Sequence, residues 1–126
     1  MKALGKHLIV ELYDCERSLI DRVDQVEAIL VEAVKVSKAT IIKPVFHQFN
    51  PHGVSGVVVI AESHFSIHTW PEYGYCALDI FTCGEQIDSD LALQFLKKAF
   101  RAKNMSIMEL KRGTLDVPEG ELKHKP

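Results

Sequence analysis

The fold is decided by one stretch in the middle of the chain, VSGVVVIAESHFSIHTW at residues 54–70. Its first part, Val54 to Ala61, contains the consecutive apolar residues Val57-Val58-Val59-Ile60, a run that is typical of a strand covered on both faces. Its last part, Phe65 to Trp70, predicts a second strand, and the polar pair Glu62-Ser63 forms the short break between the two. Strands joined by so short a connection are antiparallel neighbours, so the stretch predicts part of an antiparallel sheet.

The rest of the chain supplies further strands and two amphipathic helices. We expect strands at His7–Tyr13, Thr40–Phe49, Tyr75–Cys83 and Ser106–Leu110. Apolar residues recur with the 3.6-residue helical period over Leu19–Lys38 and Asp88–Ala102, with Asp88 or Ser89 as the N-cap of the second helix. The expected buried positions are Val23, Val26, Leu30, Ala33 and Val34 in the first helix, and Leu91, Phe95, Leu96, Ala99 and Phe100 in the second. The remainder, Asp116 to Pro126, is polar and predicts a loose tail.

This combination of elements predicts an α+β fold. Two helices among five or six strands form a two-layer sandwich, in which a mostly antiparallel sheet carries both helices on one face. The run from Val57 to Ile60 then needs a cover on its other face, and a partner subunit is the simplest candidate.

Length and composition restrict the class of protein. The chain has 126 residues, enough for a single domain over residues 1–126, with 47% hydrophobic and 25% charged residues. The net charge of −2, from 15 basic and 17 acidic residues, does not indicate binding to nucleic acid or to an anionic membrane. Three cysteines do not make a disulfide framework, and neither a signal-peptide core nor a membrane span is present in the sequence, so we expect a cytoplasmic protein.

Side chains capable of chemistry are concentrated between Phe49 and Cys83, and the residues alone leave three interpretations open. His64 and His68 could bind a metal, but in a strand they would lie about 13 Å apart, so a zinc site would need Cys83 or another histidine. Ser63 and His68 could be the nucleophile and base of a hydrolase, with Glu72 orienting the base, although no G-x-S-x-G motif surrounds Ser63.

Self-processing is the third interpretation. A serine hydroxyl in a well-held turn can attack the preceding carbonyl to form an ester, after which a base removes the serine α-proton and β-elimination releases the upstream chain. Glu62-Ser63 between two strands, with His68 nearby in sequence, has the parts that this chemistry needs.

Several motifs resemble the prokaryotic S-adenosylmethionine decarboxylase proenzymes. They are GVSGVVVIAESH at residues 53–64, IHTWPEYGY at 67–75, DIFTCG at 79–84 and LGKHL at 4–8. The resemblance covers nearly the whole chain in register and weakens only after about residue 112. Tryptophan, histidine and proline occupy matching places, which makes the resemblance specific.

The resemblance implies a self-cleaving enzyme whose cofactor is made from its own chain. The bond between Glu62 and Ser63 would be cut, leaving a β chain of residues 1–62 and an α chain of residues 63–126. Ser63 would become a pyruvoyl group, with no metal required. This group would form a Schiff base with S-adenosylmethionine, accept the electrons left by departing CO₂, and yield the aminopropyl donor for spermidine synthesis.

The resemblance also implies roles for individual residues. His68 matches the proton acceptor in processing, Cys83 the proton donor in catalysis, and Ser55 the hydroxyl that assists processing. Phe49 and Glu72 match the residues that stack on the adenine and bind the ribose hydroxyls. Cys15 and Cys76 lie outside the family motifs, and we interpret them as small buried hydrophobic residues.

Family members are homodimers whose sheets pack together with active sites at the interface, which would cover the run from Val57 to Ile60. Two alternatives remain beside this function. One is an arginine decarboxylase on the same pyruvoyl scaffold, which Phe49 and Glu72 disfavour. The other is a non-catalytic ligand-binding or oligomerisation domain in which Ser63, His68 and Cys83 are only structural.

Overall fold

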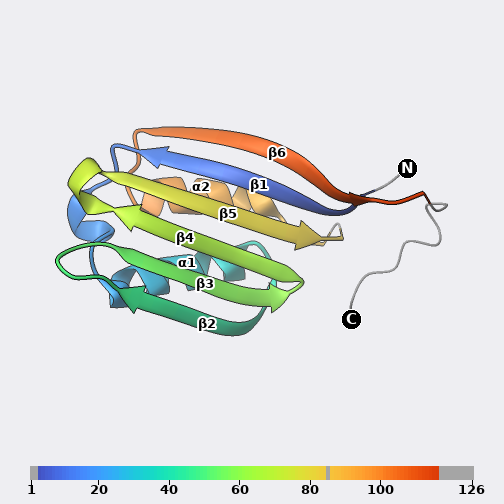
Figure 1. The fold of residues 1–126 in the computed structure, drawn as a ribbon, viewed down its shortest axis with the longest axis horizontal. Helices are drawn as coiled ribbons and strands as arrows, with labels where there is room; N and C mark the ends of the chain where they lie inside the picture. Colours follow the sequence, from blue (N-terminus) through green and yellow to red (C-terminus); the bar gives the residue numbers. More distant parts are fainter. Residues whose placement is uncertain (1–2, 85, 117–126) are drawn as a thin grey trace.

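The computed structural model describes residues 3–84 and 86–116, which form one antiparallel sheet with two helices. The sheet has six strands in the order β2-β3-β4-β5-β1-β6 (Figure 1). The strands are β1 (Ala3–Tyr13), β2 (Thr40–Gln48), β3 (Val54–Ala61), β4 (Ser63–Trp70), β5 (Tyr75–Cys83) and β6 (Asn104–Thr114). The helices are α1 (Val23–Val36) and α2 (Ser89–Ala99), with short 3-10 turns η1 (Arg17–Leu19) and η2 (Pro71–Tyr73).

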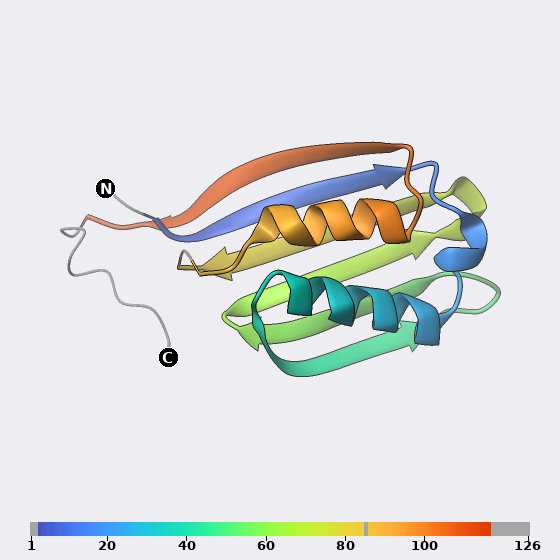
Figure 2. The same ribbon diagram turned by 180° about the vertical axis from the view of Figure 1, so that it is seen from behind.

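Both helices lie on the same face of the sheet (Figure 2), so the predicted two-layer α+β sandwich is confirmed. The core lies between the layers, because alternate residues of each central strand point toward the helices. Phe65 and Ile67 of β4 and Leu78 and Ile80 of β5 are buried there. On β3, Gly56 lies under the ring of Phe46 from β2, where a Cβ atom would come within 2.0 Å of the ring.

Helix α1 packs as predicted, whereas α2 is rotated from the predicted orientation. Val26, Leu30, Ala33 and Val34 of α1 are buried, and Val23, also predicted to be buried, is half-buried at the start of the helix. In α2 the buried positions are Ser89, Ala92, Leu93 and Leu96, continued by Phe100 after the helix. The expectation for Leu91 is therefore wrong: its side chain is 41% exposed, because the stripe that faces the sheet runs through positions 89, 92, 93, 96 and 100. Phe95 and Ala99 are half-buried.

Several predicted boundaries also shift. α1 begins at Val23 because residues 17–19 form a separate 3-10 turn, and α2 ends at Ala99, two residues before Arg101 adopts a positive φ of 54°. β1 and β6 are longer than expected, since they pair with each other from Ala3↔Thr114 to Tyr13↔Asn104. Of the predicted polar tail, residues 117–126 lie outside the described part of the chain. In the part that is described, no helix is long and apolar enough to cross a membrane.

The face of the sheet opposite the helices, called the open face below, is covered by no other part of the described chain (Figures 1 and 2). The run predicted to be covered on both faces is split between the two faces. Val58 and Ile60 are buried under the helices, whereas Val59 on the open face is 38% exposed. Met108 of β6 is 59% exposed on the same face, where it pairs with Ile9 of β1.

A matched pair of leucine substitutions tests the helix packing. Leu30→Ala in α1 should lower the free energy of unfolding by about 2–5 kcal/mol, because Leu30 is fully buried and the change leaves a cavity. Leu91→Ala in α2 should cost less than about 1 kcal/mol, since this side chain faces solvent. Urea unfolding of both variants measures the difference, and equal losses would contradict the observed orientation of α2.

Candidate active site

Ser63 and Cys83 meet at one end of the sheet, where β3 turns into β4 and β5 ends. Ser63 is the first residue of β4 and pairs with Thr82 of β5, the neighbour of Cys83 in sequence. The Oγ atom of Ser63 lies 3.6 Å from Sγ of Cys83. The backbone N–H of Cys83 donates a hydrogen bond of 3.0 Å to the carbonyl oxygen of Glu62. One residue of β5 therefore contacts both sides of the Glu62–Ser63 peptide.

Ser55 and His68 form a second polar pair on the open face. They are paired across β3 and β4, and Oγ of Ser55 lies 2.7 Å from Nδ1 of His68. The His68 side chain is exposed, and its ring lies 6.5 Å from that of Trp70. A serine hydroxyl held beside an accessible imidazole is suited to moving protons to or from a bound group.

The two pairs lie at opposite ends of the sheet. Ser63 and His68 are five residues apart on the same strand, which separates them by about 16 Å. The end with Ser63 and Cys83 is called the hairpin end below, and the end with Ser55 and His68 the loop end. Within one chain, the hydroxyl of Ser63 is therefore out of reach of the His68 imidazole, and the hydrolase arrangement that the sequence left open is not assembled.

Phe49 and Glu72 also lie at the loop end. Phe49 follows β2, is exposed, and its ring lies 4.7 Å from that of His47 in an edge-to-face contact. Its N–H donates a 2.8 Å hydrogen bond to the carbonyl of Gly53, which closes the loop before β3. Glu72 is an exposed residue of η2, directly after β4. The chain thus brings four of the predicted site residues to one end of the sheet and leaves Ser63 and Cys83 at the other.

The metal interpretation finds no assembled site. His64 and His68 both point to the open face, but they pair with Val59 and Ser55 respectively, one at each end of the β3–β4 ladder. Among the described residues, no group of three or more histidine, cysteine, aspartate or glutamate side chains converges to hold an ion.

The sequence reasoning missed a polar network at the centre of the open face. Asp79 of β5 accepts a hydrogen bond from Ser66 at 3.3 Å and lies 2.9 Å from Nε2 of His7 on β1. The His7 ring stacks on Phe81 at 5.6 Å, and the Arg112 guanidinium lies 5.3 Å from the Phe81 ring centroid. The signal was available in the alternation of β1 and β5, which places each of these side chains on the face away from the apolar core.

Among the ionisable groups on this face, His64 and Tyr75 have shifted pKa values. Partial burial lowers the pKa of His64, and the nearby negative charge of Asp79 opposes that shift. Burial and a 2.6 Å hydrogen bond to Glu11 raise the pKa of Tyr75. His64 is therefore held toward its neutral form, and Tyr75 remains protonated.

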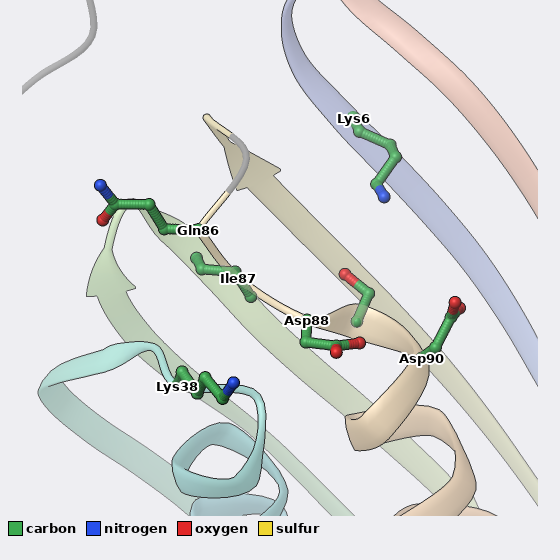
Figure 3. A pocket seen from close by; sticks show the side chains of 7 residues that line it. Lys6, Lys38, Gln86, Ile87, Asp88 and Asp90 are labelled. Atoms are coloured by element: carbon green, nitrogen blue, oxygen red, sulfur yellow. The ribbon is translucent and has the colours of Figure 1, made fainter.

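A separate hollow of about 410 Å³ opens at the N-terminal end of α2 (Figure 3). The described residues that line it are Lys6, Lys38, Gln86, Ile87, Asp88, Ser89 and Asp90, rather than the predicted site residues. Lys6 comes from β1 and Lys38 from the turn after α1, facing Asp88 and Asp90 at the start of α2. The Asp88 carboxylate caps this helix by accepting a 3.2 Å hydrogen bond from the N–H of Leu91, so part of the polarity has a structural role.

The fold is an antiparallel two-layer α+β domain. At one end of its sheet, a serine hydroxyl, a cysteine thiol and a hydrogen-bonded carbonyl lie together. Comparison with known families shows which class of protein this is. The S-adenosylmethionine decarboxylase family model matches residues 6–113. The chain therefore belongs to the S-adenosylmethionine decarboxylase family.

Individual relatives agree over nearly the full length. The chain is 52% identical over 125 residues to the S-adenosylmethionine decarboxylase proenzyme of Thermodesulfovibrio yellowstonii, covering 99% of this chain and 93% of the relative. It is 52% identical over 122 residues to the proenzyme of the same name from Thermotoga maritima, covering 94% of each. The crystal structure of the adenosylmethionine decarboxylase from Aquifex aeolicus superimposes with a TM-score of 0.87 at 36% identity, covering 94% of this chain and 98% of the other.

Proposed function

We propose that this chain is a proenzyme that cleaves itself between Glu62 and Ser63 and then decarboxylates S-adenosylmethionine. The observation that carries the proposal is the arrangement at the hairpin end: the Ser63 hydroxyl beside the Cys83 thiol, and the Glu62 carbonyl held by the Cys83 N–H. The proenzyme name shared by relatives at about half identity supports it and disfavours the arginine decarboxylase alternative. The product would serve as an aminopropyl donor, and the cytoplasmic location stays a prediction from the sequence.

Cleavage starts with the Ser63 hydroxyl. Oγ attacks the Glu62 carbonyl carbon, and the Cys83 N–H stabilises the negative charge that develops on the carbonyl oxygen. Breaking the C–N bond converts the amide into an ester and frees the Ser63 amine. A base then removes the Ser63 α-proton, the ester C–O bond breaks, and Glu62 leaves as the carboxylate end of the β chain. Water hydrolyses the remaining dehydroalanine, releasing ammonia and leaving a pyruvoyl group on the α chain.

The residues around Ser63 fit this group. The pyruvoyl group supplies a carbonyl that binds the substrate amine and accepts the electron pair left by CO₂. The Cys83 thiol lies beside the position where the group forms and carries a proton for the substrate carbon. The site is half-buried between β3, β4 and β5, which limits the access of water to the reacting atoms.

Among the described residues of one chain, the predicted base His68 does not reach Ser63, and a second copy supplies it in our proposal. His68 lies about 16 Å from Ser63 along β4, too far for proton transfer. If two open faces pack with their strands running in opposite directions, the loop end of each protomer meets the hairpin end of its partner. Two-fold symmetry then forms two equal sites, each with Ser63 and Cys83 from one protomer and with Ser55, His68, Phe49 and Glu72 from the other.

The open face has the character of such an interface. Val45, Val59, Met108 and Leu110 expose apolar side chains on it, and the hydrogen bonds of Asp79 and Glu11 already satisfy part of its polar groups within the protomer. Packing two such faces removes apolar surface from water with a small desolvation cost for the carboxylates.

Intact mass spectrometry of the denatured protein tests self-cleavage. Wild type should separate into chains of residues 1–62 and 63–126, the second with a blocked N-terminus, whereas Ser63→Ala should remain one intact chain because the nucleophile is lost. Ser66→Ala, on the same strand but paired with Asp79, serves as a matched control and should still be cut. An intact wild-type chain after prolonged incubation would overturn the proposal and favour a non-catalytic domain.

Cys83→Ala separates cleavage from turnover. The backbone N–H at position 83 remains, so the chain should still be cut, but loss of the proton donor should reduce turnover by about 10²-fold or more. Release of labelled CO₂ from S-adenosylmethionine measures turnover, with arginine as the competing substrate. Normal turnover would remove Cys83 from its assigned role, and CO₂ release from arginine alone would support the alternative substrate.

Co-expression of two inactive chains tests the shared site. His68→Ala and Ser63→Ala should each remain uncut when expressed alone. In a mixed dimer, one site combines Ser63 of the His68→Ala chain with His68 of the Ser63→Ala chain. The His68→Ala chain should therefore be cut. Intact mass identifies which chain is cut. If co-expression leaves both chains intact although mixed dimers form, the base does not come from the partner.

A further inference from the structure

Cys15 and Cys76 are free cysteines that the proposed reaction does not use, and the fold brings them together. Cys76 is the second residue of β5 and pairs with Leu12 of β1, whereas Cys15 follows β1. Beyond the end of the ladder, the N–H of Cys15 donates a 2.8 Å hydrogen bond to the carbonyl of Gly74. The Gly74 backbone, at a positive φ of 62°, makes the close approach possible, since a Cβ atom there would lie 3.2 Å from the Cys15 carbonyl oxygen.

The two thiols share the edge of the core at the loop end of the sheet. Cys15 is 6% exposed and Cys76 fully buried, and both belong to the cluster of residues between the sheet and the helices. The two side chains are close enough for each thiol to shift the pKa of the other. Cys83, the third cysteine, ends the same strand seven residues from Cys76, which places it about 23 Å away at the hairpin end.

The two thiols differ in how a reagent reaches them. Cys15 lines an open hollow of about 480 Å³, whereas Cys76 is fully buried and does not line it. The other residues that line this hollow are Asp14, Glu16, Arg17, Tyr73, Gly74, Arg101 and Lys103. The Cys76 thiol lowers the pKa of Cys15, against the opposing effects of burial and Asp14. The Cys15 thiol and burial raise the pKa of Cys76. Cys15 is thus the thiol that reacts first, and Cys76 the one that reacts second.

We propose that Cys15 and Cys76 form a reversible disulfide when a low-molecular-weight disulfide enters the hollow beside Cys15. Both thiols belong to the core between the sheet and the helices rather than to the open face. The main consequence of this inference rests on the proposed function. After the proposed cut, Cys15 would belong to the β chain and Cys76 to the α chain. Oxidation would therefore join covalently the two chains that self-cleavage separates.

The exchange balances without any other reactant. The Cys15 thiolate attacks one sulfur of the small disulfide, which breaks its S–S bond and releases one small thiol. The Cys76 thiol loses its proton and attacks the Cys15 sulfur of the mixed disulfide, which releases the second small thiol. Two protein thiols are oxidised to one disulfide, and one small disulfide is reduced to two thiols.

Non-reducing mass spectrometry of the full-length, processed protein tests the pair. After incubation with oxidised glutathione and denaturation, the β and α chains should run as one species whose mass is less than their sum by two hydrogen atoms. Reductant should restore two separate chains. Peptide mapping should place the bond between Cys15 and Cys76. Linkage through Cys83, a stable glutathione adduct on Cys15, or chains that stay separate would each overturn the proposal.

Variants provide matched controls. Cys15→Ala and Cys76→Ala should each lose the linkage completely, whereas Cys83→Ala, which leaves the pair intact, should retain it. If either core variant fails to fold, mapping of the wild-type protein still decides the result. The uncut Ser63→Ala chain separates the two proposals, because it should form the same Cys15–Cys76 bond within one chain. Its oxidation does not depend on cleavage, so failure of cleavage and failure of the disulfide are distinguishable.

Discussion

The register of β4 between β3 and β5 is the constraint on which the rest of the structure depends. Pairing Ser63 with Thr82 puts the Ser63 hydroxyl beside the Cys83 thiol, and pairing His68 with Ser55 builds the other polar pair. Because side chains alternate between faces, a slip of one residue would move His64 and His68 into the core and expose Phe65 and Ile67. The buried residues of β4 therefore fix its register, and through it the position of every reactive side chain on that strand.

The same register keeps Ser63 and His68, the proposed nucleophile and base, far apart within one protomer. A strand keeps its residues at fixed spacing, so Ser63 and His68 cannot approach each other by any rearrangement that preserves the sheet. The open face is the surface on which we propose that a second copy packs, since it carries exposed apolar side chains and polar groups that already have partners. If His68 is the base, as we propose, strand geometry therefore requires a second copy to supply it.

The sequence alone predicted the two layers, all six strands and the buried face of α1, because period-2 and period-3.6 patterns are local. It misplaced Leu91, since both faces near the start of α2 carry apolar residues and only packing decides which one faces the sheet. The residues of the candidate site came from a family resemblance, not from spacing. Their division between two ends of the sheet, and the contacts of Cys83 with Ser63 and Glu62, depend on pairing between distant segments, which no local pattern contains.

The strand order has a consequence for how the molecule must be made. A cut after Glu62 would assign β1, β2 and β3 to one piece and β4, β5 and β6 to the other, so the order β2-β3-β4-β5-β1-β6 interleaves them, with β1 between β5 and β6. Neither piece could build a continuous sheet by itself. Translation as a single polypeptide therefore supplies the two pieces in equal number. It also lets their strands pair within one sheet before a cut separates them.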